Sequence, residues 1–509
     1  MSLPKLLERL LIVSAVFFAA LPFLATHLPP AADLGQHVAQ IRLLADVADG
    51  SRPELEVSWG APGTGVYLGM LALSWVLPMG YVGWAALLLL VVAWAGTLAW
   101  VAVRRERDLA SAVLAGIFIF GASVYWGLLQ FIAGWPVLLV WFVVVEGWRR
   151  KPEGHSETRY LALIFATAVA LYLSHTMWLP VGMLWLLLRL PGAQLTLRRF
   201  LLLSLVLSPV VSMSIYWYVD VHLYRLALPS QAIASEWRLL PWERLGLMEL
   251  RHLVLGGLRG GVERVMVMVA LGWLALGLGM AVHRRWTRGE VIVPSQRVDR
   301  QLLGLAAIPT AIALFAPDQF LMTILMPERF AGGALMLLLV ALPAPVWAGS
   351  WAAAPRLVAW GIAAVFALAT TASWGIFAEE CDGIDASISQ LPERPRVLGL
   401  DFADRSSVIL GRPFMHAAAL AQAQRGGQIN FSFADFGSSL VRSRHPTLPK
   451  WNPVLEWQPD RVGDRDLLHF DYVLVNADEE THARFLAFSK GTAVVTGTRF
   501  RLIRLPNGQ

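Results

Sequence analysis

The chain contains a long series of apolar segments separated by short polar joints, and this series constrains its fold more than any other feature. The segments lie at residues 10–28, 82–102, 109–124, 131–148, 159–175, 177–190, 199–218, 264–283, 301–317, 329–348 and 355–377. A helix needs roughly 20 apolar residues, or somewhat fewer, to cross the hydrocarbon core of a bilayer. The series therefore predicts a polytopic α-helical membrane protein with about 11 transmembrane helices.

The composition agrees with this class. Hydrophobic residues make up 56% of the chain and charged residues 15%, whereas a soluble globular protein carries roughly 25% charged residues. The first apolar segment follows Lys5 and Arg9 and lacks a small-residue cleavage site, so it is interpreted as an uncleaved first helix. The net charge is +6. Because the basic residues form short clusters between apolar segments, as topology signals do, nucleic acid is not expected as a partner.

The basic clusters also orient the helices. They lie at 104–107, 149–151, 189–199 and 284–300. Lys and Arg are enriched in cytoplasmic loops, and all four clusters are cytoplasmic if the N-terminus is cytoplasmic and the short apolar stretch 66–78 does not cross. The Ala-, Leu- and Arg-rich composition favours a bacterial source. We therefore expect a protein of the bacterial cytoplasmic (inner) membrane whose first loop at 29–65 and C-terminal region face the periplasm.

After residue 377 the composition changes to that of a soluble domain. The sequence is thus divided into a transmembrane domain at 1–377 and a C-terminal periplasmic α/β domain at 378–509. Strands are predicted at 396–402, 428–433 and 470–476, helices at 414–425 and 478–490, and a closing hairpin at 492–505. The acidic pairs Asp401/Asp404 and Asp464/Asp466 are interpreted as turn residues, so no catalytic set is predicted in this domain.

Several chemical signatures are missing from the sequence. It contains no GxxxxGK[ST] phosphate loop, no GxGxxG after a strand and no HExxH zinc motif. The single cysteine, Cys381, can form no intrachain disulfide. Charges within the apolar segments, which would mark an ion path, are scarce. Since Asp and Glu collect in the outward loops, we expect any chemistry at the outer membrane surface.

The first outer loop carries the most informative pattern. From 33 to 47 its apolar residues recur at helical spacing, namely Leu34, Val38, Ile41, Leu44 and Val47. Asp33 and His37 are four residues apart and share another face of this helix. Taken alone, the pattern favours an interfacial amphipathic helix in which Asp33 is the N-cap.

The order of the segments adds to this pattern, because it resembles the GT-C superfamily of membrane glycosyltransferases, which use polyprenyl-phosphate-linked sugars. The matching pieces are Asp33-Leu-Gly-Gln-His37 with Gly50 closing the helix, Gly127-Leu-Leu-Gln130-Phe131-Ile-Ala-Gly134, Leu173-Ser-His175-Thr at a helix end, and Glu328-Arg329-Phe330 entering a late helix. The chain is most similar to the bacterial branch of YfhO-type and protein-mannosyltransferase-like proteins. The resemblance covers the membrane part of the chain.

The resemblance implies a role for each of these polar residues. Asp33 would accept the proton of an acceptor hydroxyl as the hydroxyl attacks the anomeric carbon. A lipid phosphate leaves without a general acid, unlike the leaving group of a glycoside hydrolase, but it needs positive charge to hold it, and Arg329 is the first candidate. The other substrate-binding candidates are His37, Gln130, His175 and Glu328. Each has a structural alternative, such as a snorkelling arginine at 329 or a polar helix cap at 175.

The expected cofactors and partners follow from the same resemblance. Metal-dependent members carry acidic pairs such as DxD in the first loop, whereas Asp33 stands alone here. We therefore expect an inverting, metal-independent transfer without a cofactor, with a divalent metal as the alternative. The expected partners are membrane lipids, a polyprenyl-phosphate sugar, a glycan, lipid or protein acceptor, and a protein bound to the C-terminal domain.

Two other functions remain open from the sequence. The single carboxylate in the first loop also suits a non-catalytic scaffold or assembly subunit of the same fold. A lipid or solute transporter is the third alternative, although the sequence shows neither an internal repeat nor intramembrane charges.

Overall fold

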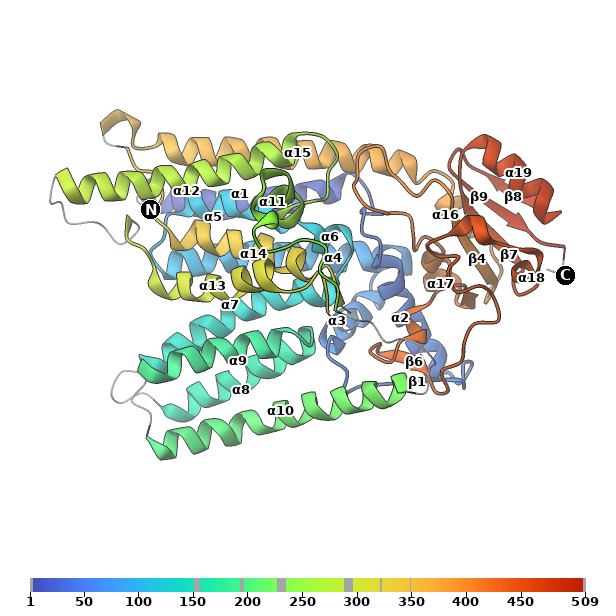
Figure 1. Ribbon diagram of the computed structural model, residues 1–509, viewed down its shortest axis with the longest axis horizontal. Helices are drawn as coiled ribbons and strands as arrows, with labels where there is room; N and C mark the ends of the chain where they lie inside the picture. The colour runs from blue at the N-terminus through green and yellow to red at the C-terminus, as the bar shows by residue number, and fades with distance from the viewer. Residues whose placement is uncertain are drawn as a thin grey trace.

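The computed structural model describes residues 3–150, 156–192, 196–226, 235–287, 296–320, 323–347 and 349–506. Its helices run along the long axis of the molecule (Figure 1). The N-terminus lies at one end of this bundle, and a five-stranded sheet with the C-terminus lies at the other.

The apolar segments form helices. These are α1 (Leu3–Ala20) continued by η1 (Leu21–Leu24), α4 (Met79–Arg104), α5 (Leu109–Ala115), η2 (Gly116–Ile119), α6 (Ala122–Tyr125), α7 (Leu129–Arg149), α8 (Glu157–Ser174), α9 (Trp178–Arg189), α10 (Leu197–Leu226), α12 (Val262–Thr287), α13 (Arg300–Phe315), α14 (Met326–Ala341) and α15 (Ala354–Glu380). Among the described residues, 5 helical segments are long and apolar enough to cross a membrane. They lie at Met79–Arg104, Leu129–Arg149, Leu197–Tyr224, Val262–Thr287 and Gly349–Glu380. The expected number of about 11 transmembrane helices stays a prediction.

The segment expected as one helix at 109–124 is instead divided among α5, η2 and α6. The division occurs where the chain passes close to another segment. A Cβ on Gly121 would lie 3.1 Å from the carbonyl oxygen of Val254, at the end of α11 (Leu247–Val254). The stretch at 66–78 contains α3 (Thr64–Ser74), a helix of 11 residues. A helix of this length, about 16 Å, is too short to span a hydrocarbon core of about 30 Å.

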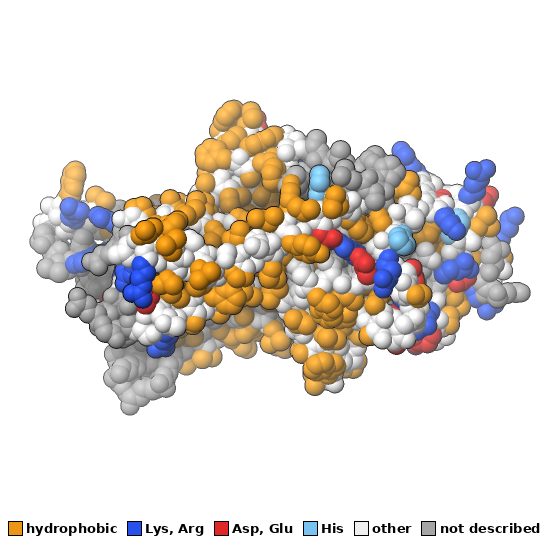
Figure 2. Space-filling model, turned by 90° about the horizontal axis from the view of Figure 1, so that it is seen from below, with side chains coloured by type: hydrophobic (Ala, Val, Ile, Leu, Met, Phe, Trp, Pro, Cys, Tyr) orange, Lys and Arg blue, Asp and Glu red, His pale blue; other side chains and the backbone are white. Residues whose placement is uncertain are grey.

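The surface is banded in the way a membrane protein requires. Hydrophobic side chains cover the middle of the face seen in Figure 2, whereas Lys and Arg gather near one end and mixed charges near the other. Large apolar side chains are exposed along the long helices, for example Leu205 on α10, Val265 on α12 and Leu368 on α15. An exposed apolar surface of this kind is stable against lipid and not against water.

The basic clusters meet at one end of the bundle. Nε of Arg105, after α4, lies 2.7 Å from a carboxylate oxygen of Asp299, the N-cap of α13. Nε of Arg189, at the end of α9, lies 2.6 Å from a carboxylate oxygen of Glu146 near the end of α7. Joints far apart in the sequence therefore contact one another, in agreement with their expected location on one side. Which side of the membrane they face stays a prediction.

The C-terminal region contains a mixed sheet of strand order β5-β4-β7-β9-β8. Its strands are β4 (Arg396–Asp401), β5 (Gln428–Ile429), β7 (Tyr472–Asn476), β8 (Thr492–Thr496) and β9 (Phe500–Arg504), and its helices include α16 (Ile384–Ser389), α17 (Ala418–Arg425) and α19 (Glu479–Ser489). β4 is parallel to β5 and β7, and β8 and β9 form the expected antiparallel hairpin.

Two of these elements are shorter than expected. The strand at 428–433 ends after Ile429 because the chain leaves the sheet there to contact α2 (Leu34–Ala48): Gln36 donates to Phe431 O and accepts from Phe433 N. The helix at 414–425 begins at Ala418, and Phe414 before it stacks on Phe377 of α15 with ring centroids 5.1 Å apart.

The first loop and the C-terminal region are joined by strand pairing and by side-chain contacts. β1 (Leu55–Val57) pairs antiparallel with β6 (Val441–Ser443). Arg442 of β6 pairs with Glu56 at 2.9 Å and with Asp220 of α10 at 2.6 Å. α2 is covered on its polar face as well, because Gln36, His37 and Gln40 are all buried. The first loop thus lies between the helical bundle and the sheet.

Candidate functional site

Asp33 stands at the N-terminus of α2, and the turn before α7 fixes its backbone. Asp33 N donates to Trp126 O at 2.9 Å, and Ala32 N donates to Tyr125 O at 3.0 Å. The next residue, Gly127, has φ +74°, and a Cβ there would lie 3.0 Å from Leu34 N. Glycine at 127 therefore meets two requirements at once, a left-handed backbone and a close approach of the loop that carries Asp33.

The Asp33 side chain makes no capping hydrogen bond to α2. Its Oδ1 instead lies 2.9 Å from Nδ1 of His416, which comes from the turn before α17. The carboxylate therefore does not cap the helix, whereas the N-cap interpretation would require it to accept a hydrogen bond from the first turn.

His416 lies between two carboxylates. Its Nε2 lies 3.2 Å from Oε1 of Glu456, and the other oxygen of Glu456 accepts from the Asn430 side chain at 3.1 Å. The ring is stacked on Phe431 at 4.9 Å between centroids, with 8° between the planes. His416 and Glu456 are both buried. His416 and Glu456 were missed in the sequence, because they lie hundreds of residues from Asp33 and no local motif marks them.

Electrostatics sets the protonation of these groups. Burial alone would lower the pKa of His416, but the carboxylates of Glu456 and Asp33 outweigh it and raise that pKa above its usual value. Burial raises the pKa of Glu456 to about 7, against the opposing effect of His416. By contrast, burial lowers the pKa of His37 to about 4. His37 is therefore neutral near pH 7, whereas His416 and Glu456 share a proton.

His37 and Gln130 meet at Tyr67 of α3. Nδ1 of His37 lies 3.0 Å from the Tyr67 hydroxyl, and the same hydroxyl is hydrogen-bonded to Gln130. Gln130 is packed against Gly63, which has φ +86° and where a Cβ would clash with the Gln130 amide. Two of the expected substrate-binding residues thus share one hydroxyl next to Asp33.

Arg329 and His175 meet over the ring of Phe131. The Arg329 guanidinium carbon is 5.7 Å from the centroid of this ring, and the His175 ring is 5.6 Å from it. Arg329 is buried and donates from Nε to Ile324 O at 2.8 Å, so it does not snorkel to a membrane surface. Asp33 is within electrostatic range of Arg329. His175 accepts from Met177 N at 3.2 Å, which is the contact expected of a local polar cap.

Glu328 is directed elsewhere. Its electrostatic neighbours are Asp318, Arg244 and Arg238, and Asp318 is itself paired with Arg244 at 3.0 Å. The structure therefore brings Asp33, His37, Gln130, His175 and Arg329 into one region, whereas Glu328 lies beside the Arg244–Asp318 ion pair.

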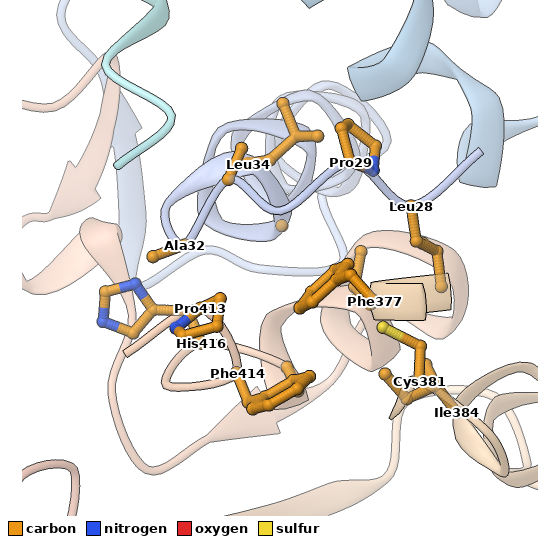
Figure 3. A pocket seen from close by; sticks show the side chains of 14 residues that line it. Leu28, Pro29, Ala32, Leu34, Phe377, Cys381, Ile384, Pro413, Phe414 and His416 are labelled. Carbon is orange, nitrogen blue, oxygen red and sulfur yellow. The ribbon is translucent and has the colours of Figure 1, made fainter. Parts of the chain in front are cut away.

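A small apolar pocket, partly open to solvent, adjoins His416 (Figure 3). Leu28, Pro29 and Leu34 line it on the side of the first loop, and Phe377, Cys381 and Phe414 line it on the opposite side. It is therefore formed jointly by the first loop, the end of α15 and the C-terminal region.

The whole architecture is similar to a solved structure. The crystal structure of ArnT from Cupriavidus metallidurans in the apo state matches with a TM-score of 0.57, covering 99% of this chain and 98% of that chain. The protein has the overall fold of ArnT. The sequence identity is 12%, so the likeness extends to the fold alone.

No family model and no curated protein matches the sequence. The expected resemblance to the GT-C superfamily and to its YfhO-type branch stays a prediction. Among the described residues, no group of three or more His, Cys, Asp or Glu side chains is arranged to hold a metal ion.

Proposed function

We propose that the protein is a glycosyltransferase that moves a sugar from a polyprenyl-phosphate donor to an envelope acceptor at the outer face of the bacterial inner membrane. The observation that carries the proposal is the position of Asp33. In a fold like that of ArnT, it stands in the first loop with its carboxylate unused by the helix and within electrostatic range of the buried Arg329.

In the proposed step, an oxygen of the acceptor hydroxyl forms a bond to the anomeric carbon of the sugar. The bond from that carbon to the phosphate oxygen breaks, and the bonding pair leaves with the polyprenyl phosphate. The hydroxyl proton passes to Asp33 and is later released to solvent. Attack opposite the leaving group inverts the anomeric centre.

Arg329 is proposed to hold the phosphate. Among the described residues no acid is in ion-pair contact with Arg329, and a buried guanidinium of this kind can bind an anion through paired N–H groups. His175 and the pair His37–Gln130 are proposed to contact sugar or phosphate, since neutral imidazole and amide groups suit sugar hydroxyls. No step of this chemistry is assigned to a metal ion.

The first test is mass spectrometry of the lipids that copurify with the protein in mild detergent. The proposal predicts a polyprenyl-phosphate sugar, which would identify the donor and its sugar together. The preparation is then repeated after adding such a donor. Recovery of phospholipids alone in both preparations would contradict the proposal and favour a scaffold subunit.

A further inference from the structure

We infer that the C-terminal region completes the active site, with His416 and Glu456 as positioning residues that hold the Asp33 carboxylate in its working orientation. The inference rests on the proposed function, in which Asp33 is the base. It gives the C-terminal region a direct part in transfer, which the sequence did not indicate.

The geometry around His416 fixes the ring. Phe431 stacks on its face, and its two nitrogens lie 2.9 Å from Asp33 and 3.2 Å from Glu456. Asn430 holds the far oxygen of Glu456. With Oδ1 of Asp33 engaged by His416, the second carboxylate oxygen keeps a defined direction in which to receive a proton.

Contacts other than this trio also join the C-terminal region to the rest of the protein. Neutral contacts already join the region to the first loop: Gln36 bonds to the backbone at 431 and 433, Gln40 accepts from Val441 N at 2.7 Å, and β1 pairs with β6. Burying two acids and an imidazole costs free energy that neutral contacts avoid. A role in positioning Asp33 accounts for the trio, whereas docking alone does not.

The trio holds an exchangeable proton. The titratable groups facing His416 are Asp33 and His37 on the side of α2, and Glu456, with Asp401 behind it, on the side of the sheet. Both contacts of His416 are satisfied when both ring nitrogens are protonated, or when Nδ1 and Glu456 are. Loss of the shared proton at alkaline pH leaves one acid facing a bare nitrogen, and Asp33 then loses its partner in part of the molecules.

Two substitutions of one residue test the inference. The amide of Asn replaces Nδ1 of a histidine, whereas that of Gln replaces Nε2, so His416→Asn keeps the contact to Asp33 and His416→Gln keeps the contact to Glu456. With a polyprenyl-phosphate hexose as the probe, release of polyprenyl phosphate is measured. We expect H416Q to lower kcat roughly 10–100-fold, with the KM for the donor unchanged, and H416N to retain most of the wild-type kcat.

The dependence of turnover on pH provides a second readout. It would not change if His416 and Glu456 had only a structural role. Wild-type turnover should decline as pH rises through the titration of the trio. Glu456→Gln supplies a neutral donor to Nε2, so Nδ1 keeps its proton and the alkaline decline should disappear. His445→Gln, at an exposed position of the same region, is the matched control and should leave the profile unchanged.

Equal loss of turnover in H416N and H416Q, with both proteins folded, would overturn the inference. An unchanged alkaline decline in E456Q would do the same. A further measurement is independent of turnover: the free energies of unfolding of D33A, H416Q and the double variant form a thermodynamic cycle, in which each single change removes the contact between the two side chains. Additive effects in this cycle would exclude the coupling of Asp33 to His416, whereas inactivity of the wild type would count against the proposed function instead.

Discussion

The two ends of the helical bundle handle buried charge differently. At the basic end two acids each face an arginine, Glu146 facing Arg189 at 2.6 Å and Asp299 facing Arg105 at 2.7 Å. Charges matched in this way hold the joints between helices together. Within these two pairs each charge is neutralised by its partner, so neither acid is free to take up a proton.

At the opposite end other charges are also paired, for example Arg442 with Glu56 and Asp220, but the buried charges around Asp33 are not matched one to one. Asp33 and Glu456 face the two nitrogens of a single imidazole, His416. Arg329 donates to a backbone carbonyl, and among the residues that the structure describes it has no acid in ion-pair contact. Since an unmatched charge is costly to bury, we interpret this end as built for chemistry and the basic end as built for stability.

The largest expected effect comes from changing one acid at each end to its amide, which replaces a single carboxylate oxygen by NH₂. Asp33→Asn should reduce transfer about 10²–10⁴-fold, because the amide cannot accept the proton. Its unfolding free energy should change little, since the amide oxygen still accepts from His416. Glu146→Gln, the matched change at the basic end, should keep transfer per folded molecule but lose about 2 kcal/mol of stability. Both values come from initial rates and urea unfolding, and a stability loss in D33N comparable to that of E146Q would remove the distinction.

Arg329→Lys tests the cation in the same way. Lysine keeps the charge but loses the planar pair of N–H groups, so the KM for the lipid-linked donor should rise roughly 10-fold at similar kcat. Arg105→Lys at the basic end loses its paired contact to Asp299 and should lower stability without changing the KM. Steady-state kinetics of both variants decides this, and an unaltered KM in R329K would argue against phosphate binding by Arg329.

The sequence predicted the two ends to different extents. Each apolar segment became helical because apolar runs and their polar joints are local signals. The helix at 33–47 and the grouping of the basic clusters also follow from local pattern. The hairpin at 492–505 was correct for the same reason.

The trio at Asp33 could not be predicted in this way. His416 and Glu456 approach Asp33 because α17 packs on α2: a Cβ on Gly35 would lie 3.3 Å from Ala419 Cβ. No sequence pattern near His416 or Glu456 predicts that these side chains approach Asp33. Glu328 shows another limit of local sequence: it adjoins Arg329 in the chain, but its electrostatic neighbours include Asp318 and Arg244. Its contact with substrate stays a prediction.

A pH titration of stability tests the shared proton. The folded pKa of Glu456, about 7, exceeds its usual 4.5, and that of His416 is also raised, so the folded state binds these protons more tightly than the unfolded state. Their stabilisation is complete at low pH and is lost as pH rises through about 7. The pKa values of Asp401 and Asp435 are also raised, to about 6, so these two groups likewise lower the stability as pH rises, but at lower pH. The pKa of His37 is lowered, so His37 has the opposite effect on stability below its usual pKa.

We therefore expect the free energy of unfolding to fall by on the order of 1–2 kcal/mol between pH 6 and 8, and Glu456→Gln to flatten this fall. Urea unfolding at a series of pH values measures it. His469→Gln, a change of another histidine in the C-terminal region, should leave the slope as it is in the wild type. Parallel slopes in the wild type and E456Q would mean that the trio holds no extra proton.

The smallest expected effect concerns the backbone beneath Asp33. Gly127 and Gly50 have nearly the same φ, +74° and +75°, but a Cβ at 127 would lie 3.2 Å from Asp33 N, whereas a Cβ at 50 would meet nothing within 4 Å. Gly50→Ala should therefore cost about 1 kcal/mol from the left-handed backbone alone. Gly127→Ala should cost that amount and also displace the loop that carries Asp33, so turnover should fall several-fold as well. If turnover per folded molecule is the same in G127A and G50A, the turn before α7 does not position the carboxylate, and its close approach to Asp33 serves packing only.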